Sequence, residues 1–320
     1  MPKLKAVLWS IIISIATYGI WIAFNEYDAV MASVEKLGLL GFATICGLSL
    51  LNYFIRFIRW HWYLTIMGHS IPIFRHILYY LSGFALTTTP GKAGEAIRSL
   101  YLKQHDVDYP TSLAAFVSER FSDLISVLLI ALIAITYFED YKYVAIGFGI
   151  FLIISIAMIQ SKSFRPFCAD LIQQHTTGKV TTLLLHIIDI VEQMAQLMTF
   201  KVLIIGLVLG VISWGCEAYA FAIIGQALGS DAPILIFSGI YAISMLIGAI
   251  SFLPGGLGST EAVMYLLLIS TGMDSSVAVS ATLLCRIATL WLAVLVGFFA
   301  LFIVETKFKS DKLVESSKPI

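Results

Sequence analysis

The chain has 320 residues, of which 59% are hydrophobic and only 12% charged, and its mean hydropathy is +0.92. Soluble domains carry about a quarter charged residues, so this composition excludes an ordinary water-soluble domain and indicates a lipid bilayer as solvent. Twenty basic and twenty acidic residues give a net charge of zero, which argues against a nucleic-acid partner. The sequence therefore predicts an integral membrane protein.

Six apolar runs are long enough to cross a bilayer, because a spanning helix needs about 20 residues. They cover residues 6–24, 38–58, 112–138, 142–160, 201–228 and 277–304. The first run is longer than the roughly 7 to 15 apolar residues of a signal peptide, so we expect it to be retained. Two further stretches, 73–89 and 233–253, end at Pro-Gly and are predicted to be re-entrant.

These runs predict an all-α polytopic membrane protein with about six full transmembrane helices and two re-entrant broken-helix elements. Residues 1–305 are expected to form a single transmembrane domain, and residues 306–320 a polar cytoplasmic tail. Residues 180–200 carry apolar side chains at helical spacing, with polar side chains opposite. This pattern is typical of an amphipathic helix on the cytoplasmic interface, with partner binding as the alternative.

Lysines and arginines are expected to concentrate on the cytoplasmic side. With a cytoplasmic N-terminus and two re-entrant stretches, sixteen of the twenty fall on that side, and only Lys36 and Lys142 fall outside. Counting either Pro-Gly stretch as a full crossing would remove this asymmetry. We therefore expect both termini on the cytoplasmic side of a bacterial-type inner membrane. The sixteen include Arg56, Arg59, Lys92 and Arg98, and the aromatic residues Trp60, Trp62, Tyr63, Tyr79 and Tyr80 nearby are expected to form an interfacial belt.

Two segments, 90–95 and 254–261, share the pattern P-G-x-x-G followed by glutamate. Each is followed by an arginine in a long apolar helix. The glutamate and the arginine are 25 residues apart in both cases, Glu95 to Arg120 and Glu261 to Arg286. Three predicted crossings separate the two turns, so they would enter from opposite faces. This predicts an inverted repeat (about 73–138 and about 233–304), as in transporters whose broken helices meet at the substrate site.

Arg120 and Arg286 are the strongest candidates for substrate binding. An arginine at the centre of a membrane helix costs about 2.5 to 3.5 kcal/mol on insertion scales, so it faces a partner or a water-filled path. A guanidinium keeps its charge and can bind phosphate through two parallel hydrogen bonds. The alternative is a buried ion pair, of Arg120 with Asp123 or Glu95 and of Arg286 with Glu261. The two interpretations can hold together.

Glycines in the two turns and five buried carboxylates complete the predicted site. Glycine and proline interrupt a helix, and the helix that restarts exposes backbone amides that can bind an anion. Five carboxylates against two arginines could not all be ionised. We therefore expect either a protonated carboxylate that couples transport to protons, or charge balance by a lipid or ion. The glycines are Gly91, Gly94, Gly255, Gly256 and Gly258, and the carboxylates are Glu95, Glu119, Asp123, Glu217 and Glu261.

The sequence shows no catalytic or metal-binding pattern. It contains no Ser-His-Asp, Cys-His or H-E-x-x-H arrangement, and its four cysteines form no C-x-x-C pair. Lys92 and Gly94 lack the spacing and the preceding strand of a nucleotide-binding loop. We therefore expect a protein that is not an enzyme and that carries no cofactor and no metal.

Four segments carry a family resemblance: Thr89–Arg98, Ser118–Asp123, Leu253–Glu261 and Cys285–Trp291. With these motifs the chain resembles the lysylphosphatidylglycerol synthase transmembrane region, also called flippase-like membrane proteins. The resemblance implies movement of a lipid with a modified anionic or polyisoprenoid headgroup between leaflets. Synthases of that family carry a large aminoacyl-transferase domain after the membrane part. Here the chain ends about 15 residues past the last predicted helix, so synthase activity is not expected.

The sequence thus predicts translocation of a lipid with an anionic or phosphate-containing headgroup, of the phospholipid or polyisoprenyl phosphate type. One alternative is a secondary transporter of a small soluble anion. Another is a non-transporting subunit that presents a lipid to a glycosyltransferase, and homo-oligomers also remain open. A lipid carrier should have a cavity that opens sideways between helices, whereas a solute carrier should be sealed from lipid.

Overall fold

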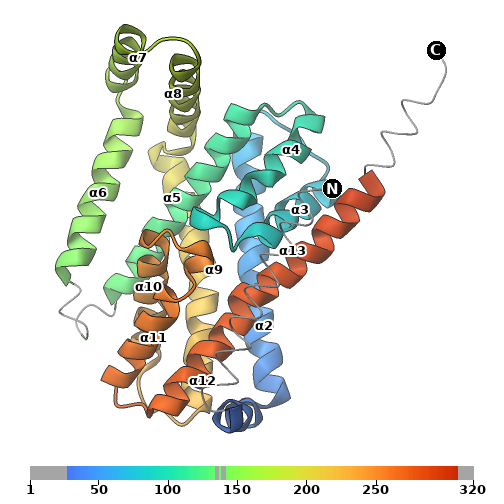
Figure 1. Cartoon of the computed structure of the whole chain (residues 1–320), viewed down its shortest axis with the longest axis vertical. Helices are drawn as coiled ribbons and strands as arrows, with labels where there is room; N and C mark the ends of the chain where they lie inside the picture. The colour runs from blue at the N-terminus through green and yellow to red at the C-terminus, as the bar shows by residue number, and fades with distance from the viewer. Residues whose placement is uncertain (1–26, 134–136, 138–141, 309–320) are drawn as a thin grey trace.

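The computed structural model describes residues 27–133, 137 and 142–308, and these residues form helices joined by short turns (Figure 1). The predicted all-α fold is confirmed for this part of the chain. The run predicted at 6–24 lies outside the described residues, and so do residues 309–320 of the predicted tail. A helix satisfies every backbone polar group within its own segment, which explains why so apolar a chain is built from helices.

Long helices form the centre of the bundle. Helix α2 (Tyr27–Ile66) bends at Gly38, where φ is 66°. The C-terminal rod is continuous through two π-helical segments. The long elements are α2, α5 (Tyr109–Ile133), α9 (Phe200–Ala227) and the rod of α12 (Ser275–Arg286), η6 (Ile287–Trp291), α13 (Leu292–Ile303) and η7 (Val304–Phe308).

Shorter elements surround this centre. They are α3 (Ile73–Ser82), η1 (Gly83–Leu86), η2 (Pro90–Ile97), α4 (Arg98–Leu102), η3 (Lys103–His105), α6 (Lys142–Gln160), α7 (Phe164–His175), α8 (Lys179–Leu197), α10 (Ile234–Ile250), η5 (Pro254–Gly256) and α11 (Ser259–Ser270). The largest apolar core joins α5, α9, α10, α11 and α12, and a second core packs α2 against α3 and α13.

Four of the described helices are long and apolar enough to cross a membrane, or five if the bent pair of α6 and α7 counts as one span. The four are Tyr27–Ile66, Lys179–Leu197, Phe200–Ala227 and Ser275–Lys307. Helix α5 has 25 residues but carries Glu119, Arg120 and Asp123 near its middle. The described residues therefore support an integral membrane protein, while the number of six crossings is not confirmed.

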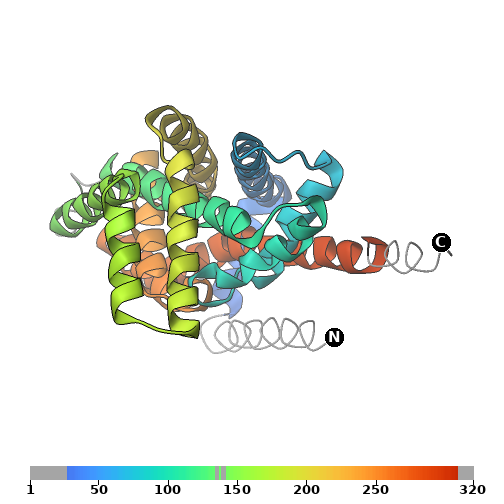
Figure 2. The same ribbon diagram turned by 90° about the horizontal axis from the view of Figure 1, so that it is seen from above.

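Helices α7 and α8 form a hairpin across one end of the bundle. Figure 2 shows them side by side in the plane of that end, and Figure 1 shows them end on. The chain bends by 79° between α6 and α7. Helix α8 coincides with the amphipathic helix predicted at 180–200, with Leu183 and Ile187 exposed and Met194 and Leu197 buried against the bundle. This transverse placement fits an interfacial helix better than a span.

The two Pro-Gly stretches reverse direction and meet. Helices α10 and α11 run side by side in the lower half of Figure 1 and are joined by η5, while α3 and α4 lie in the upper half. Segment η1 packs on η2, since a Cβ on Gly83 would lie 3.1 Å from the carbonyl oxygen of Glu95. A Cβ on Gly255 would lie 3.4 Å from the Cα atom of Thr88. The two turns are therefore in direct contact.

Several residues expected at the cytoplasmic surface are buried instead. Helix α2 continues to Ile66, beyond the predicted end at residue 58, so its last turns lie inside the bundle. Of the predicted belt, Trp60, Tyr63, Tyr79 and Tyr80 are at most 1% exposed, and only Trp62 is partly exposed. The belt prediction is wrong for the four buried rings. Arg56, Arg59 and Arg98 are also buried, so they do not support the predicted orientation.

Candidate functional site

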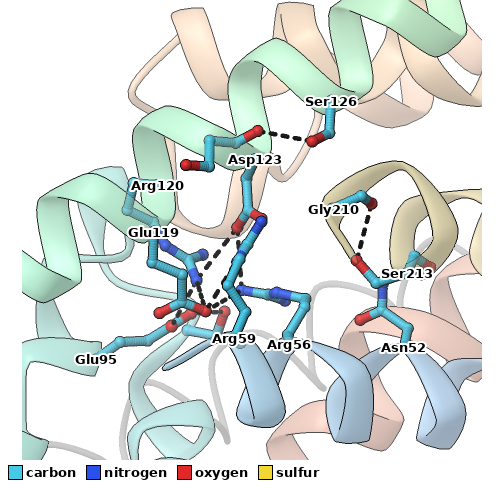
Figure 3. A network of polar contacts seen from close by, with 12 residues as sticks. Asn52, Arg56, Arg59, Glu95, Glu119, Arg120, Asp123, Ser126, Gly210 and Ser213 are labelled. Atoms are coloured by element: carbon cyan, nitrogen blue, oxygen red, sulfur yellow. Dashed lines mark hydrogen bonds and ion pairs between the residues drawn. The ribbon is translucent and has the colours of Figure 1, made fainter. Parts of the chain in front are cut away.

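Four arginines and three carboxylates form one buried ion-pair cluster where α2, α5 and the first Pro-Gly turn meet (Figure 3). Two arginines come from α2, where a spacing of three residues puts them on one helical face. Helix α5 contributes an arginine and two carboxylates. The members of the cluster are Arg56, Arg59, Glu95, Arg98, Glu119, Arg120 and Asp123.

Asp123 and Glu119 each bind several guanidinium groups. Asp123 accepts a short hydrogen bond from Arg59, and its Oδ2 lies 3.2 Å from Nη2 of Arg56 and 3.3 Å from Nη2 of Arg120. Glu119 Oε1 lies 3.0 Å from Nη2 of Arg120 and 3.4 Å from Nη2 of Arg56. Buried charges of this kind are stable only when they are paired, because each must replace lost hydration.

Glu95 links the first turn to the cluster. Its Oε2 lies 3.2 Å from Nη2 of Arg98 and 3.7 Å from Nη2 of Arg120, while Oε1 accepts a 2.8 Å hydrogen bond from Oγ1 of Thr87. The guanidinium of Arg98 also lies over the rings of Trp60 and Tyr80. Arg120 therefore pairs with Asp123 and Glu95, as the ion-pair interpretation predicted, and it also pairs with Glu119.

Arg286 makes a smaller and tighter arrangement in the second turn. Its Nε donates to Oε1 of Glu261 over 2.6 Å, and its Nη2 donates to the carbonyl oxygen of Gly255 over 2.7 Å. The backbone N–H of Gly258 donates to Oε2 of Glu261 over 2.7 Å. The predicted ion pair of Arg286 with Glu261 is thus confirmed.

The predicted glycines serve the two turns differently. Gly255, Gly256 and Gly258 have φ values of 62°, 67° and 85°, in the left-handed region that favours glycine. Gly94 has no such conformation and is needed for space, because a Cβ there would lie 2.5 Å from the Cβ atom of Leu86. The surroundings of Gly91 are not among the features that the structure describes.

The expected excess of acidic groups is wrong. The site brings together the five predicted carboxylates and six cations, namely Arg56, Arg59, Lys92, Arg98, Arg120 and Arg286. Glu217 is not in the ion-pair cluster and accepts a short hydrogen bond from Tyr241 instead. With six cations and five carboxylates, the ionised site has a positive excess that suits an anion. The charge count therefore gives no reason to expect a protonated carboxylate.

A cavity of about 490 Å³ lies between α5, α6, α9, α10 and the two turns, and we call it the main cavity. Lys92, Arg120 and Asp123 line its polar end. The remaining wall is largely apolar, and several of the apolar side chains that line it, among them Phe151, Ile250 and Phe252, are themselves exposed. The main cavity therefore has a charged end and an apolar rim on the outside of the bundle, between α6 and α10.

A second cavity of about 40 Å³, the small cavity, adjoins the main cavity. Arg286, Glu95 and Glu217 line it, whereas Arg120 does not. Arg120 and Arg286 thus line two different but adjoining cavities. Four residues line both cavities: Lys92, Trp214, Met245 and Gly255.

A third cavity, of about 1010 Å³, lies elsewhere, around the segments 228–232 and 270–274. Its lining includes none of the predicted site residues, and its charged members are Asp231 and Asp274. An acidic lining repels phosphate, so this cavity does not fit the predicted substrate.

Sequence reasoning missed Trp214, treated Lys92 as a loop charge and assigned Arg56, Arg59 and Arg98 to the cytoplasmic surface. One signal for the α2 arginines was available, since Arg56 and Arg59 follow directly on an apolar run at a spacing of three residues. The repeat gave a signal for Lys92. The corresponding position in the second turn is Gly256, so the two copies of the motif differ there by a charged side chain. Trp214 had no comparable signal, since it lies within a continuous apolar run.

Comparison with known proteins places this geometry in a family context. The family described as Lysylphosphatidylglycerol synthase TM region matches residues 7–297. A UPF0104 membrane protein of Methanocaldococcus jannaschii is 24% identical over 79% of this chain and 82% of its own length, and one of Pyrococcus horikoshii is 24% identical over 78% and 84%. A UPF0104 membrane protein of Methanothermobacter thermautotrophicus is 30% identical over 101 residues, which are 32% of this chain and 30% of that protein.

Proposed function

Because the chain belongs to the lysylphosphatidylglycerol synthase transmembrane family, we propose that it moves a lipid with a phosphate-containing headgroup between the two leaflets of its membrane. One observation carries the proposal: the main cavity is cationic at one end and apolar at its rim. A lipid has the complementary shape, with a charged headgroup attached to apolar chains.

The electrostatics of the main cavity support an anionic headgroup. Lys92 and Arg120 line it together with a single carboxylate, Asp123. The buried cluster behind it has four arginines for three carboxylates, so an added phosphate would offset a positive excess. Charge-assisted hydrogen bonds from ammonium and guanidinium groups to phosphate are shorter and stronger than neutral ones.

The rim of the main cavity supports a lipid rather than a soluble anion. Phe151 on α6 is 59% exposed and Phe252 beside the second turn is 72% exposed, although both line the cavity. A transporter of a small soluble anion would gain nothing from an apolar rim that faces the bilayer. We therefore favour the lipid over the soluble anion.

The arrangement of the two turns supports transport across the membrane rather than binding alone. The α3–α4 and α10–α11 elements lie toward opposite ends of the bundle, and their turns touch (Figure 1). In transporters built from inverted repeats, such elements expose one site alternately to the two sides. An inverted repeat with six crossings, cytoplasmic termini and an inner-membrane location are parts of this proposal. A homo-oligomer or a glycosyltransferase partner stays a prediction.

Transfer can be measured with the full chain reconstituted into phosphatidylcholine vesicles that contain a trace of NBD-labelled phosphatidylglycerol. External dithionite bleaches only the outer leaflet, so bleaching beyond that of protein-free vesicles reports transfer. We expect transfer of this lipid and little transfer of an NBD-labelled neutral glycolipid. Equal transfer of both lipids would contradict a phosphate-recognising site.

A variant that fills the main cavity gives a second test. Ala249 is exposed and lines the cavity, so Ala249→Trp should block transfer without disturbing the buried core. Ala262 on α11 is also exposed and lines none of the described cavities, so Ala262→Trp is the matched control. Wild-type transfer by Ala249→Trp would show that lipid does not pass through this cavity.

A further inference from the structure

Two side chains at the junction of the main and small cavities keep donors that no described residue uses. The ammonium of Lys92 lies 5.7 Å from the centre of the Trp214 ring. Within the described part of the chain, no carboxylate lies within 4.0 Å of this ammonium and it makes no hydrogen bond. The indole of Trp214 is 5% exposed, and its Nε1–H has no acceptor among the described residues.

The arginines of the site differ from Lys92 in being ion-paired, although guanidinium N–H groups of Arg56, Arg59, Arg98 and Arg120 also lack a hydrogen-bond acceptor among the described residues. Each of the five lies within 4.0 Å of at least one carboxylate. Their charges bind carboxylates of the first turn, α5 and α11, so a ligand that bound these arginines would share them with those carboxylates. The ammonium of Lys92 has no described carboxylate within 4.0 Å, and Glu95 attracts it only from farther away, so its three donors are available to a ligand.

The backbone of Lys92 points to the same conclusion. Its φ value of 56° lies in the left-handed region, which few residues other than glycine adopt. At the corresponding position of the second turn the chain has Gly256, with a φ value of 67°. A glycine would suit the first turn better for folding alone. Strained backbone and an unpaired buried donor at one place are typical of sites whose missing partner is a ligand.

From this juxtaposition we propose that Lys92 and Trp214 form the seat of the lipid phosphate, while the arginines mainly hold the fold. This inference rests on the function proposed above and names the groups that recognise the headgroup. The ammonium offers three donors above the ring face, and the indole offers one at the ring edge. A phosphate beside the ring can accept from both, and Arg56, whose Cζ lies 5.3 Å from the same ring centre, adds to the positive potential.

The seat can be tested by binding to the purified full chain in detergent. The probes are dihexanoylphosphatidic acid, dihexanoylglycerol as the phosphate-free match, and inorganic phosphate as the soluble source. Indole fluorescence is the readout, and the wild type minus Trp214→Phe isolates the contribution of residue 214. We expect a spectral change with the phosphatidic acid, none with dihexanoylglycerol, and a much weaker response to inorganic phosphate.

Trp214→Phe keeps an aromatic ring but removes the N–H together with the five-membered ring of the indole. Because it also removes the fluorescent reporter, its affinity for dihexanoylphosphatidic acid is measured by isothermal titration calorimetry. A hydrogen bond to a charged group predicts roughly tenfold or more loss of affinity. Thermal stability without ligand should fall only by the packing that the smaller ring loses in the core, because the N–H itself has no acceptor among the described residues. Trp62→Phe, at a partly exposed ring on α2, is the matched control and should bind like the wild type. Unchanged affinity of Trp214→Phe for dihexanoylphosphatidic acid would contradict the proposal that Trp214 binds the phosphate.

Lys92→Gln gives an independent variant, with Lys179→Gln at an exposed position on α8 as its control. We expect at least a tenfold loss of phosphatidic acid binding for Lys92→Gln and none for the control. Undiminished binding by Lys92→Gln would overturn the seat even if the wild type transfers lipid. Conversely, tight binding without any lipid transfer by the wild type would uphold the seat and contradict the proposed function.

Discussion

The two Pro-Gly turns share a sequence pattern but are held in different ways. In the second turn, one arginine links both ends of the motif. Arg286 binds Glu261 over 2.6 Å and the carbonyl oxygen of Gly255 over 2.7 Å. In the first turn, the corresponding pair is loose, since Arg120 lies 3.7 Å from Glu95 and has Glu119 and Asp123 as closer partners.

The difference indicates a division of roles. In the second turn Glu261 is paired with Arg286 at short distance, and three glycines with positive φ shape the backbone, so this turn forms a firm support. The first turn shares its glutamate with a cluster of several arginines and carries Lys92 where the second has glycine. One copy of the motif is thus stabilised from within, and the other is open to a ligand. The predictions below test this contrast.

The largest effect is expected from Arg286→Gln. It leaves Glu261 buried without its ion-pair partner, and breaking a buried pair in this way costs about 3–5 kcal/mol. Arg120→Gln should cost clearly less, because Arg98, Arg56 and Arg59 still neutralise the carboxylates of the cluster. The free energy of unfolding in mixed micelles, from denaturant titration, measures both.

Arg165→Gln is the control for these arginine variants. Its ion pair with Glu192 spans 3.7 Å at the surface of the α7–α8 hairpin, so its loss should change stability by less than about 1 kcal/mol. If Arg120→Gln proved as costly as Arg286→Gln, the two turns would be equally rigid and the contrast would fail.

The sequence predicted the helices whose apolar runs are uninterrupted. Helix α6 has the predicted bounds, 142–160, and α9 differs from the prediction by one residue at each end. Helix α2 was cut short because Arg56 and Arg59 end its apolar run. Those charges are neutralised by Glu119 and Asp123, about 60 residues further along the chain, and composition cannot show such a partner.

The candidate site was predictable to the same extent. The 25-residue spacing predicted the pair of Glu261 with Arg286 correctly, because each turn needs a charge partner from a following helix. It could not show that Glu95 is shared with Arg98, or that Arg120 and Arg286 line two adjoining cavities. The position of Lys92 over Trp214 depends on how α9 packs against the first turn, and no local pattern encodes that contact.

A smaller effect is expected from glycine substitutions, with a different cause in each turn. Gly94→Ala puts a Cβ within 2.5 Å of Leu86 Cβ and 2.8 Å of the Thr89 side chain, so overpacking should cost about 1–3 kcal/mol. Gly258→Ala meets no atom within 4 Å but forces an L-residue to a φ of 85°, at roughly 1–2 kcal/mol.

A second substitution at each position separates the two causes. Gly94→Ser should be worse than Gly94→Ala, because the extra atom adds to the overlap. At position 258, serine and asparagine should cost about as much as alanine, because the loss comes from the backbone (φ 85°, ψ −53°) and not from side-chain overlap. Denaturant titration again gives the values, and recovery by asparagine at position 94 would contradict a steric role for Gly94.

The smallest change in stability, and the sharpest test of the contrast, is expected at Lys92. Lys92→Gly makes the first turn resemble the second, and Lys92→Ala removes the same ammonium but keeps the strained φ of 56°. Glycine adopts this conformation without the cost of roughly 1–2 kcal/mol that other residues carry, although it loses more chain entropy on folding. We expect Lys92→Gly to be about 0.5–1 kcal/mol more stable than Lys92→Ala and no less stable than the wild type.

Both variants should lose transfer of NBD-phosphatidylglycerol about equally, roughly tenfold, because both lack the charge. A protein that gains or keeps stability while it loses transfer has a ligand-binding residue at this position. If Lys92→Gly instead destabilised the protein as Arg286→Gln is expected to do, Lys92 would be a structural residue and the first turn would be no more open than the second.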